Sequence, residues 1–128
     1  MTLKELSQLY YLRREIEQEQ QRVRELRARA TSVTANLSGT PHSGAISDKT
    51  AIAAEIADCE ALIAAKIAES TVEYKRLVTY INGIEDSLTR QIFTARFVDG
   101  LRWEQVADRV GGSSDAVKKT CYRYLNRK

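Results

Sequence analysis

The stretch VGGSSDAVKK at residues 110–119 combines two glycines, two serines, an aspartate and two lysines, and TCYRYLNRK follows it at 120–128. Glycines allow the chain to turn sharply. Ser113 is a good N-cap for a helix, and Asp115 in the first turn would face the positive end of the helix dipole. The stretch therefore predicts a tight turn and then a capped helix from Ser114 to Arg127.

A second helix is predicted just before this turn, over LRWEQVADRV at residues 101–110. Four of its residues share one side of a helix and are expected to be buried: Trp103, Val106, Ala107 and Val110. A third helix precedes it, with Ser87 as the expected N-cap, and it ends at Asp99 and Gly100, where glycine supplies the left-handed conformation. Its expected apolar positions are Leu88, Ile92, Phe93, Phe97 and Val98.

The spacing of Ala107, Gly111 and Val117 fits a helix-turn-helix, which needs a small residue at the helix crossing, a glycine in the turn and a branched apolar residue pointing back. At about 100° per residue, the expected inward residues of the last helix are Val117, Cys121 and Tyr124. The expected outward residues are Asp115, Lys119, Tyr122 and Asn126, flanked by Ser114, Lys118 and Arg123. Such a polar and basic face can enter the major groove of DNA.

The distribution of charge supports a polyanion as partner. Residues 88–128 carry nine Lys and Arg against four Asp and Glu, a balance of +5. Residues 1–33 carry seven against five, and residues 34–87 carry four against eight. A basic C-terminal region on an otherwise balanced chain favours double-stranded DNA as the partner.

Upstream of this region, apolar residues recur at steps of three and four and predict a long amphipathic helix from about Thr2 to Thr31. They are Leu9, Leu12, Ile16, Val23, Leu26, Ala30 and Val33, with Glu19 where another apolar residue is due. The periodicity then stops in TSVTANLSGTPHSGAISD, which is rich in Ser, Thr and Gly, so a loop is expected at about residues 32–47.

A second long helix is expected to begin near Ser47 or Asp48, either of which could cap it. Its expected seam is Ile52, Ile56, Cys59, Ile63, Ile67, Ser70, Tyr74, Leu77, Ile81 and Ile84. Two such helices joined by one loop predict an antiparallel hairpin with a coiled-coil seam. The expected fold is therefore all-α, with the hairpin at 1–85 and the helix-turn-helix domain at 86–128. A hairpin buries only one seam, so it needs a further partner, which is either another copy of itself or the C-terminal domain. Homo-oligomerisation through the hairpin is therefore expected.

Several other classes of protein are not favoured. The 128 residues contain no apolar run of signal-peptide or membrane-span length, so we expect a cytoplasmic protein without a membrane partner. Cys59 and Cys121 have no metal-binding spacing, and His42 beside Pro41 has no nearby Cys or carboxylate pair. Phosphate-binding glycine motifs are absent from the sequence. We therefore expect neither an enzyme nor a cofactor or metal.

The C-terminal stretch RFVDGLRWEQVADRVGGSSDAVKK resembles region four of bacterial sigma factors, the domain that contacts the promoter −35 element. The resemblance extends from about Leu88 to Lys128. The whole chain is also similar to small bacteriophage proteins related to the RinA-like and ArpU-like regulators of late genes. These resemblances imply a regulator, most simply an activator, of phage or prophage transcription in the bacterial cytoplasm.

Carried over by position, the resemblance implies that Ser114, Asp115, Lys118 and Lys119 contact bases. It implies phosphate contacts from Arg102, Ser113, Tyr122 and Arg123. The chain departs from the family pattern at Gly112, where an apolar residue is usual, and at Arg102, where a Ser or Thr cap is usual. Nothing upstream resembles the remaining sigma domains, so the chain is not expected to be a complete sigma factor.

Two alternative functions stay open at this point. One is a phage DNA-packaging protein of the small-terminase type, which also joins a helix-turn-helix to helical oligomerisation elements. The other is a helical protein-interaction module that binds bacterial RNA polymerase. Oligomeric state separates the first from a regulator, and the salt dependence of binding separates the second.

Overall fold

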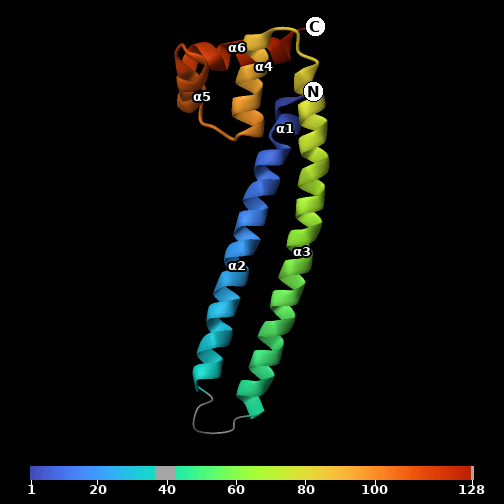
Figure 1. The fold of residues 1–128 in the computed structure, drawn as a ribbon, viewed down its shortest axis with the longest axis vertical. Coiled ribbons are helices and arrows are strands. Elements are labelled where there is room, and N and C mark those ends of the chain that lie inside the picture. The colour runs from blue at the N-terminus through green and yellow to red at the C-terminus, as the bar shows by residue number, and fades with distance from the viewer. Residues whose placement is uncertain (37–42, 128) are drawn as a thin grey trace. The chain divides into compact units, whose positions relative to one another are not determined.

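The computed structural model of the chain describes the backbone of residues 1–36 and 43–127 and the side chains of 1–32 and 48–127. The described elements are all helical, which confirms the predicted all-α class (Figure 1). They are α1 (Leu3–Leu6), α2 (Gln8–Asn36), α3 (Ser43–Asn82), α4 (Ser87–Phe93), the π-helical turn η1 (Thr94–Val98), α5 (Trp103–Val110) and α6 (Ser114–Asn126).

The chain forms two compact units. The first unit contains Met1–Leu12 and Glu69–Lys128, and the second contains Arg13–Ala68. The boundary expected between residues 85 and 86 thus falls inside the first unit. The reason is that α1, the start of α2 and the end of α3 share the core of the first unit with the C-terminal helices.

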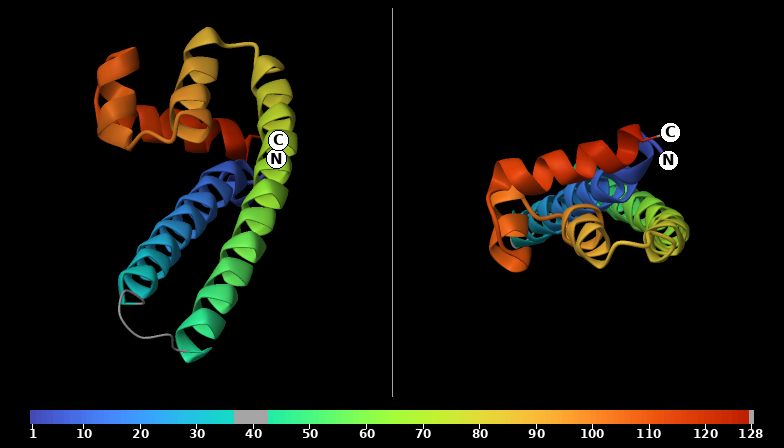
Figure 2. Two further views of the ribbon diagram at one scale, coloured as in Figure 1. Left: turned by 60° about the horizontal axis from the view of Figure 1, so that its bottom comes forward. Right: turned by 90° about the horizontal axis from the view of Figure 1, so that it is seen from above.

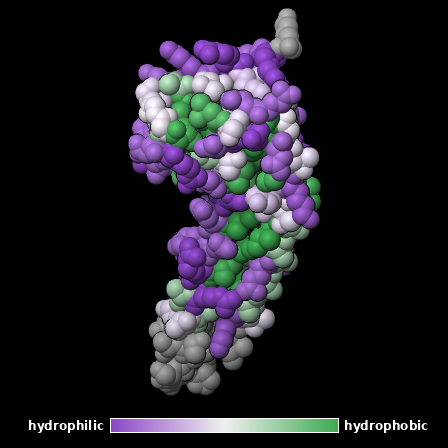
Figure 3. All heavy atoms as spheres, turned by 45° about the horizontal axis from the view of Figure 1, so that its top comes forward, coloured by the Kyte–Doolittle hydropathy of each residue, from purple (hydrophilic) through white to green (hydrophobic). Residues whose placement is uncertain are grey.

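In the second unit, α2 and α3 run antiparallel, and hydrophobic residues lie along the middle of this hairpin (Figures 1 and 3). The least exposed residues of α2 in this unit are Ile16, Glu19, Val23, Leu26 and Ala30. Those of α3 are Ile52, Ile56, Cys59, Ile63 and Lys66. Two ion pairs join the helices, Arg27 with Glu60 and Lys66 with Glu15. The predicted hairpin and most of its seam are therefore confirmed.

The predicted seam of α3 is wrong at two positions, because Ile67 is 46% exposed and Tyr74 is 43% exposed. Lys66 and Glu73 are half-buried in their place, while Ser70 is half-buried as predicted. Strict alternation of steps of four and three, 3.5 residues on average, keeps the same face of a helix toward its partner. Two consecutive steps of four led the prediction to Ile67, which lies to one side of that face.

The expected loop at about 32–47 is too long, since α2 continues to Asn36 and α3 begins at Ser43 rather than near Ser47 or Asp48. Hydroxyl residues are compatible with a helix when they bond to the preceding turn. The Thr31 hydroxyl does so, donating to the Arg27 carbonyl at 3.0 Å. The helix α2 therefore extends beyond the last residue of the apolar pattern.

The predicted helix from Thr2 is interrupted at Ser7, which separates α1 from α2. Thr2 caps α1, because its hydroxyl accepts from the Glu5 N–H at 3.2 Å while the Glu5 carboxylate accepts from the Thr2 N–H at 2.8 Å. The bond from the Thr2 N–H lowers the pKa of the Glu5 carboxyl. The capping box gives α1 a defined start and positions Leu6 in the core of the first unit.

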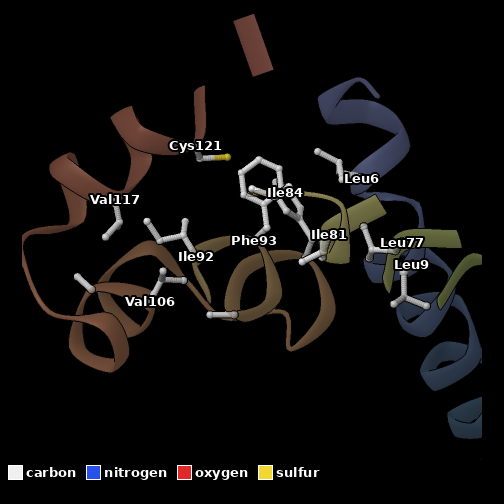
Figure 4. Close-up of a cluster of buried hydrophobic side chains, with 13 residues drawn as sticks. Leu6, Leu9, Leu77, Ile81, Ile84, Ile92, Phe93, Val106, Val117 and Cys121 are labelled. Carbon is white, nitrogen blue, oxygen red and sulfur yellow. The ribbon is translucent and has the colours of Figure 1, made fainter. Parts of the chain in front are cut away.

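The core of the first unit joins residues that are far apart in the sequence (Figure 4). Phe93 of α4 is fully buried and meets Phe97 and Tyr124, each edge to face with ring centroids 5.4 Å apart. Leu6 and Leu9 from the N-terminal helices belong to the same cluster. Figure 2 shows α6 crossing α4 and α5, so α6 rests on both.

Two expectations about α4 are wrong. Asp86, not Ser87, is the N-cap, because its carboxylate accepts from both the N–H and the hydroxyl of Thr89, at 3.0 and 2.6 Å. These bonds lower the pKa of the Asp86 carboxyl. Leu88 is 46% exposed, and the buried residue of that turn is Thr89. Because the Asp86 carboxylate caps the helix one position before Ser87, Thr89 rather than Leu88 faces the core.

Candidate functional site

The turn between α5 and α6 depends on two glycines. Gly111 and Gly112 have φ values of +87° and +103°, which residues with a Cβ rarely adopt. The Gly111 N–H donates to the Ala107 carbonyl at 2.7 Å, so the last turn of α5 closes before the chain reverses. Gly112 stands where the sigma-factor pattern has an apolar residue. It therefore gives the turn backbone freedom and makes no core contact of the kind that an apolar side chain would make.

The helix after this turn begins as predicted. Ser113 is the N-cap of α6, and its hydroxyl accepts from the Ala116 N–H at 3.1 Å. Asp115 lies in the first turn, where a negative charge favours the helix dipole. The start of α6 is thus fixed by its own sequence.

Buried residues from three helices hold α5 and α6 together. Val106 and Ala107 of α5 share one buried cluster with Val117 and Cys121 of α6. Ile92 of α4 lies between Val106 and Cys121 in this cluster (Figure 4). The predicted inward positions Ala107, Val117 and Cys121 are all buried. This packing fixes the rotation of α6 and hence which of its residues reach solvent.

The opposite face of α6 carries most of the residues singled out from the sequence. Asp115, Lys118, Lys119, Arg123 and Asn126 are exposed, Ser113 is exposed at the N-cap, and Ser114 is half-buried. Three of these side chains are cations. The structure therefore brings the predicted residues of α6 onto one exposed surface, which we call the α6 face.

Tyr122 differs from the expectation, because it is half-buried instead of pointing outward. Its ring packs edge to face on Trp103 of α5, with centroids 6.2 Å apart and planes at 67°. Trp103 is itself only half-buried. An aromatic pair excludes water from more surface than either ring alone, and this draws Tyr122 toward α5.

A cation lies at each end of this aromatic pair. The Arg96 guanidinium lies 4.6 Å from the Trp103 ring and donates to the Leu101 carbonyl at 2.9 Å. The Lys118 ammonium lies 6.0 Å from the Tyr122 ring. Arg96 was not among the predicted site residues, because no sequence pattern links it to Trp103 seven residues later.

Arg102 stands at the N-cap position of α5, where Ser or Thr would be usual. The Gln105 side chain compensates, because its Oε1 accepts from the Arg102 N–H at 3.0 Å. The Arg102 side chain is exposed. It is therefore available to a ligand at the positive end of α5.

Other candidate chemistry receives no support from the described residues. Burial raises the pKa of the Cys121 thiol to about 12, so it is not an activated nucleophile. In the part of the chain that is described, no three His, Cys, Asp or Glu residues gather as metal ligands would. His42 lies outside the described residues.

Comparison with protein-family models, curated proteins and solved structures gave no match. None of the described helices combines the length and apolar character that crossing a membrane requires.

Proposed function

We propose that this chain is a sequence-specific DNA-binding regulator, most simply an activator, of bacteriophage or prophage transcription. The observation that carries the proposal is the α6 face, a capped helix with exposed lysines and an arginine that is anchored from behind by Val117 and Cys121. A helix held in this way can enter the major groove without rearranging its core.

The first two turns of α6 would contact bases. Lysines such as Lys118 and Lys119 donate to guanine O6 and N7, and a carboxylate such as Asp115 accepts from cytosine N4. Ser114 is half-buried, so it would contact only a base edge that comes close to the helix N-terminus. These contacts give the α6 face a means of distinguishing sequences.

The remaining residues would contact phosphates and fix the orientation of the protein on DNA. Arg102 and Arg123 are exposed cations. The Ser113 hydroxyl accepts the capping bond and can still donate its own hydrogen to a phosphate. Tyr122 is held by Trp103, so its hydroxyl would act from a fixed position at the edge of the α6 face.

The regulatory role and the phage context are part of the same proposal and come from the resemblance of the C-terminal stretch to sigma region four. Within it, the helical hairpin joins two copies of the chain or contacts bacterial RNA polymerase in the bacterial cytoplasm. The α6 face itself supports only the DNA-binding part.

Selection of bound sequences from a random duplex library, at two salt concentrations, tests this function. A regulator enriches a motif that survives the higher salt, because base contacts add to phosphate contacts. Salt-sensitive binding without a motif, together with a closed ring of subunits, would instead indicate a packaging protein. Absence of binding at both concentrations would leave a protein-interaction module.

A further inference from the structure

A small pocket lies in the first unit, between the N-terminal helices and the chain that leads into α5. Its volume is about 150 Å³. Ser7, Tyr10 and Tyr11 line it from one side, and Arg96, Gly100 and Arg102 line it from the other. We call it the tyrosine pocket.

The chemistry of the tyrosine pocket suits an anion. Its lining provides three hydroxyls and two guanidiniums and includes no carboxylate. Tyr11 is 58% exposed, and its ring packs edge to face on that of Tyr10 at 5.5 Å. Among the described residues, no carboxylate forms an ion pair with Arg102. Arginine and tyrosine are donors that proteins use for phosphate oxygens.

The pocket has a defined shape because the chain around it is constrained. Gly100 has a φ of +69°, and a Cβ on it would lie 3.5 Å from Tyr10 Cδ2. Arg96 is fixed by its bond to the Leu101 carbonyl and by the Trp103 ring. Its guanidinium is therefore positioned before any ligand arrives.

A chain of side-chain contacts links the pocket to Lys118 of the α6 face. Arg102 lines the pocket and belongs to the set of predicted phosphate contacts. Arg96 stacks on Trp103, Trp103 packs on Tyr122, and Lys118 lies over Tyr122. One row of side chains thus leads from the N-terminal tyrosines to the recognition helix. A DNA backbone that passes Arg102 would lie against this pocket.

We propose that the tyrosine pocket binds a phosphate of the DNA backbone beside the major groove that α6 enters, so that the N-terminal segment is part of the DNA-binding surface. The inference rests on the proposed function. Tyr11 and Arg102 donate to the phosphate oxygens, and Arg96 supplies a fixed positive charge behind them. The contact adds affinity on every sequence and carries no base preference.

Tyr11→Phe tests this contact, since it removes one hydroxyl from an exposed ring. The variant should bind a cognate duplex and an unrelated duplex about 3- to 10-fold more weakly, by the same factor on both. Tyr74→Phe is the matched control, because Tyr74 is an exposed tyrosine of the first unit outside the pocket, and its affinity should equal that of the unmodified chain. Ethylation interference should show one phosphate that matters for the unmodified chain and no longer matters for Tyr11→Phe.

The outcomes separate the two proposals. Unchanged affinity of Tyr11→Phe, with normal DNA binding by the unmodified chain, would overturn the phosphate pocket and leave the proposed function standing. An equal loss in Tyr74→Phe would also overturn the pocket. Failure of the unmodified chain to bind any duplex would overturn the proposed function and the pocket with it.

Discussion

Trp103 of α5 and Tyr122 of α6 pack edge to face with ring centroids 6.2 Å apart. Through this contact α5 supports the side of α6 on which Tyr122 lies. Buried residues hold α6 from behind, and this pair holds it from the side. The position of the α6 face therefore depends on a contact at its edge as well as on the core.

Substitutions at Tyr122 should separate its two roles. Tyr122→Phe keeps the ring on Trp103, so the stability of the first unit should be unchanged while DNA affinity falls a fewfold. Tyr122→Ala removes the ring and should also lower the free energy of unfolding by about 1–2 kcal/mol. Chemical denaturation and DNA titration of both variants measure this. Equal DNA affinity for Tyr122→Phe and the unmodified chain would contradict the phosphate contact.

The cap of α6 should matter for stability and for binding in different ways. Ser113→Ala should cost about 0.5–2 kcal/mol of unfolding free energy, because the Ala116 N–H loses its acceptor. Ser113→Asp restores a cap and should retain stability, yet it places a negative charge toward the phosphates and should weaken DNA binding. Thermal melts and binding curves are compared for the two variants. If Ser113→Asp bound DNA as well as the unmodified chain, Ser113 would not face a phosphate.

Arg123→Ala should weaken binding to all duplexes alike. A phosphate contact releases about one counterion, so the slope of log affinity against log salt should become shallower by about 1. Lys75→Ala is the control, since Lys75 is an exposed cation of the first unit on α3. A change in sequence preference for Arg123→Ala would indicate a base contact instead.

The buried thiol of Cys121 predicts alkaline instability of the first unit. Its pKa is about 12 when folded, against about 8.5 for an exposed thiol. The ionisation of this thiol therefore costs no stability below about pH 8.5, and it lowers the free energy of unfolding as the pH rises toward the folded value, by up to about 1.4 kcal/mol per pH unit. Cys121→Ala has no such group and should lose less stability between about pH 8 and 10. Parallel losses in both proteins would contradict this linkage.

Glu19 places a carboxylate in the mostly apolar seam of the hairpin. Its Oε2 is buried without a hydrogen-bond partner among the described residues, and its Oε1 lies 3.7 Å from Arg22 Nη1. Burial, and then the neighbouring Glu19 carboxylate, raise the pKa of the Cys59 thiol. Glu19→Leu should complete the apolar seam and raise the unfolding free energy by about 1 kcal/mol or more. A drop in stability would show that Glu19 has a partner in solution.

The turn and α6 could be predicted because their determinants are local. Gly111, Ser113 and Val117 each act within a few residues of their own position, through backbone freedom, capping and a short helical interval. The hairpin was predictable for a similar reason, since a repeated spacing specifies a helix face whatever lies beyond it.

The errors concern contacts that the spacing of apolar residues does not encode. Lys66 lies along the α3 seam because strict alternation takes precedence over side-chain type, and its stem can pack while its ammonium reaches Glu15. Tyr122 turned toward α5 because Trp103 lies there. The tyrosine pocket joins the first twelve residues to the approach to α5, and no local pattern links segments so far apart.

The central claim, that the α6 face contacts bases, is tested most directly by selecting duplexes from one random library with the unmodified chain and with Lys119→Ala in parallel. We predict that the unmodified chain enriches a motif and that Lys119→Ala enriches the same motif with preference lost at one base pair, at a cost of about 1–3 kcal/mol on the cognate site. Identical motifs and affinities for the two proteins, or no motif for either, would contradict it.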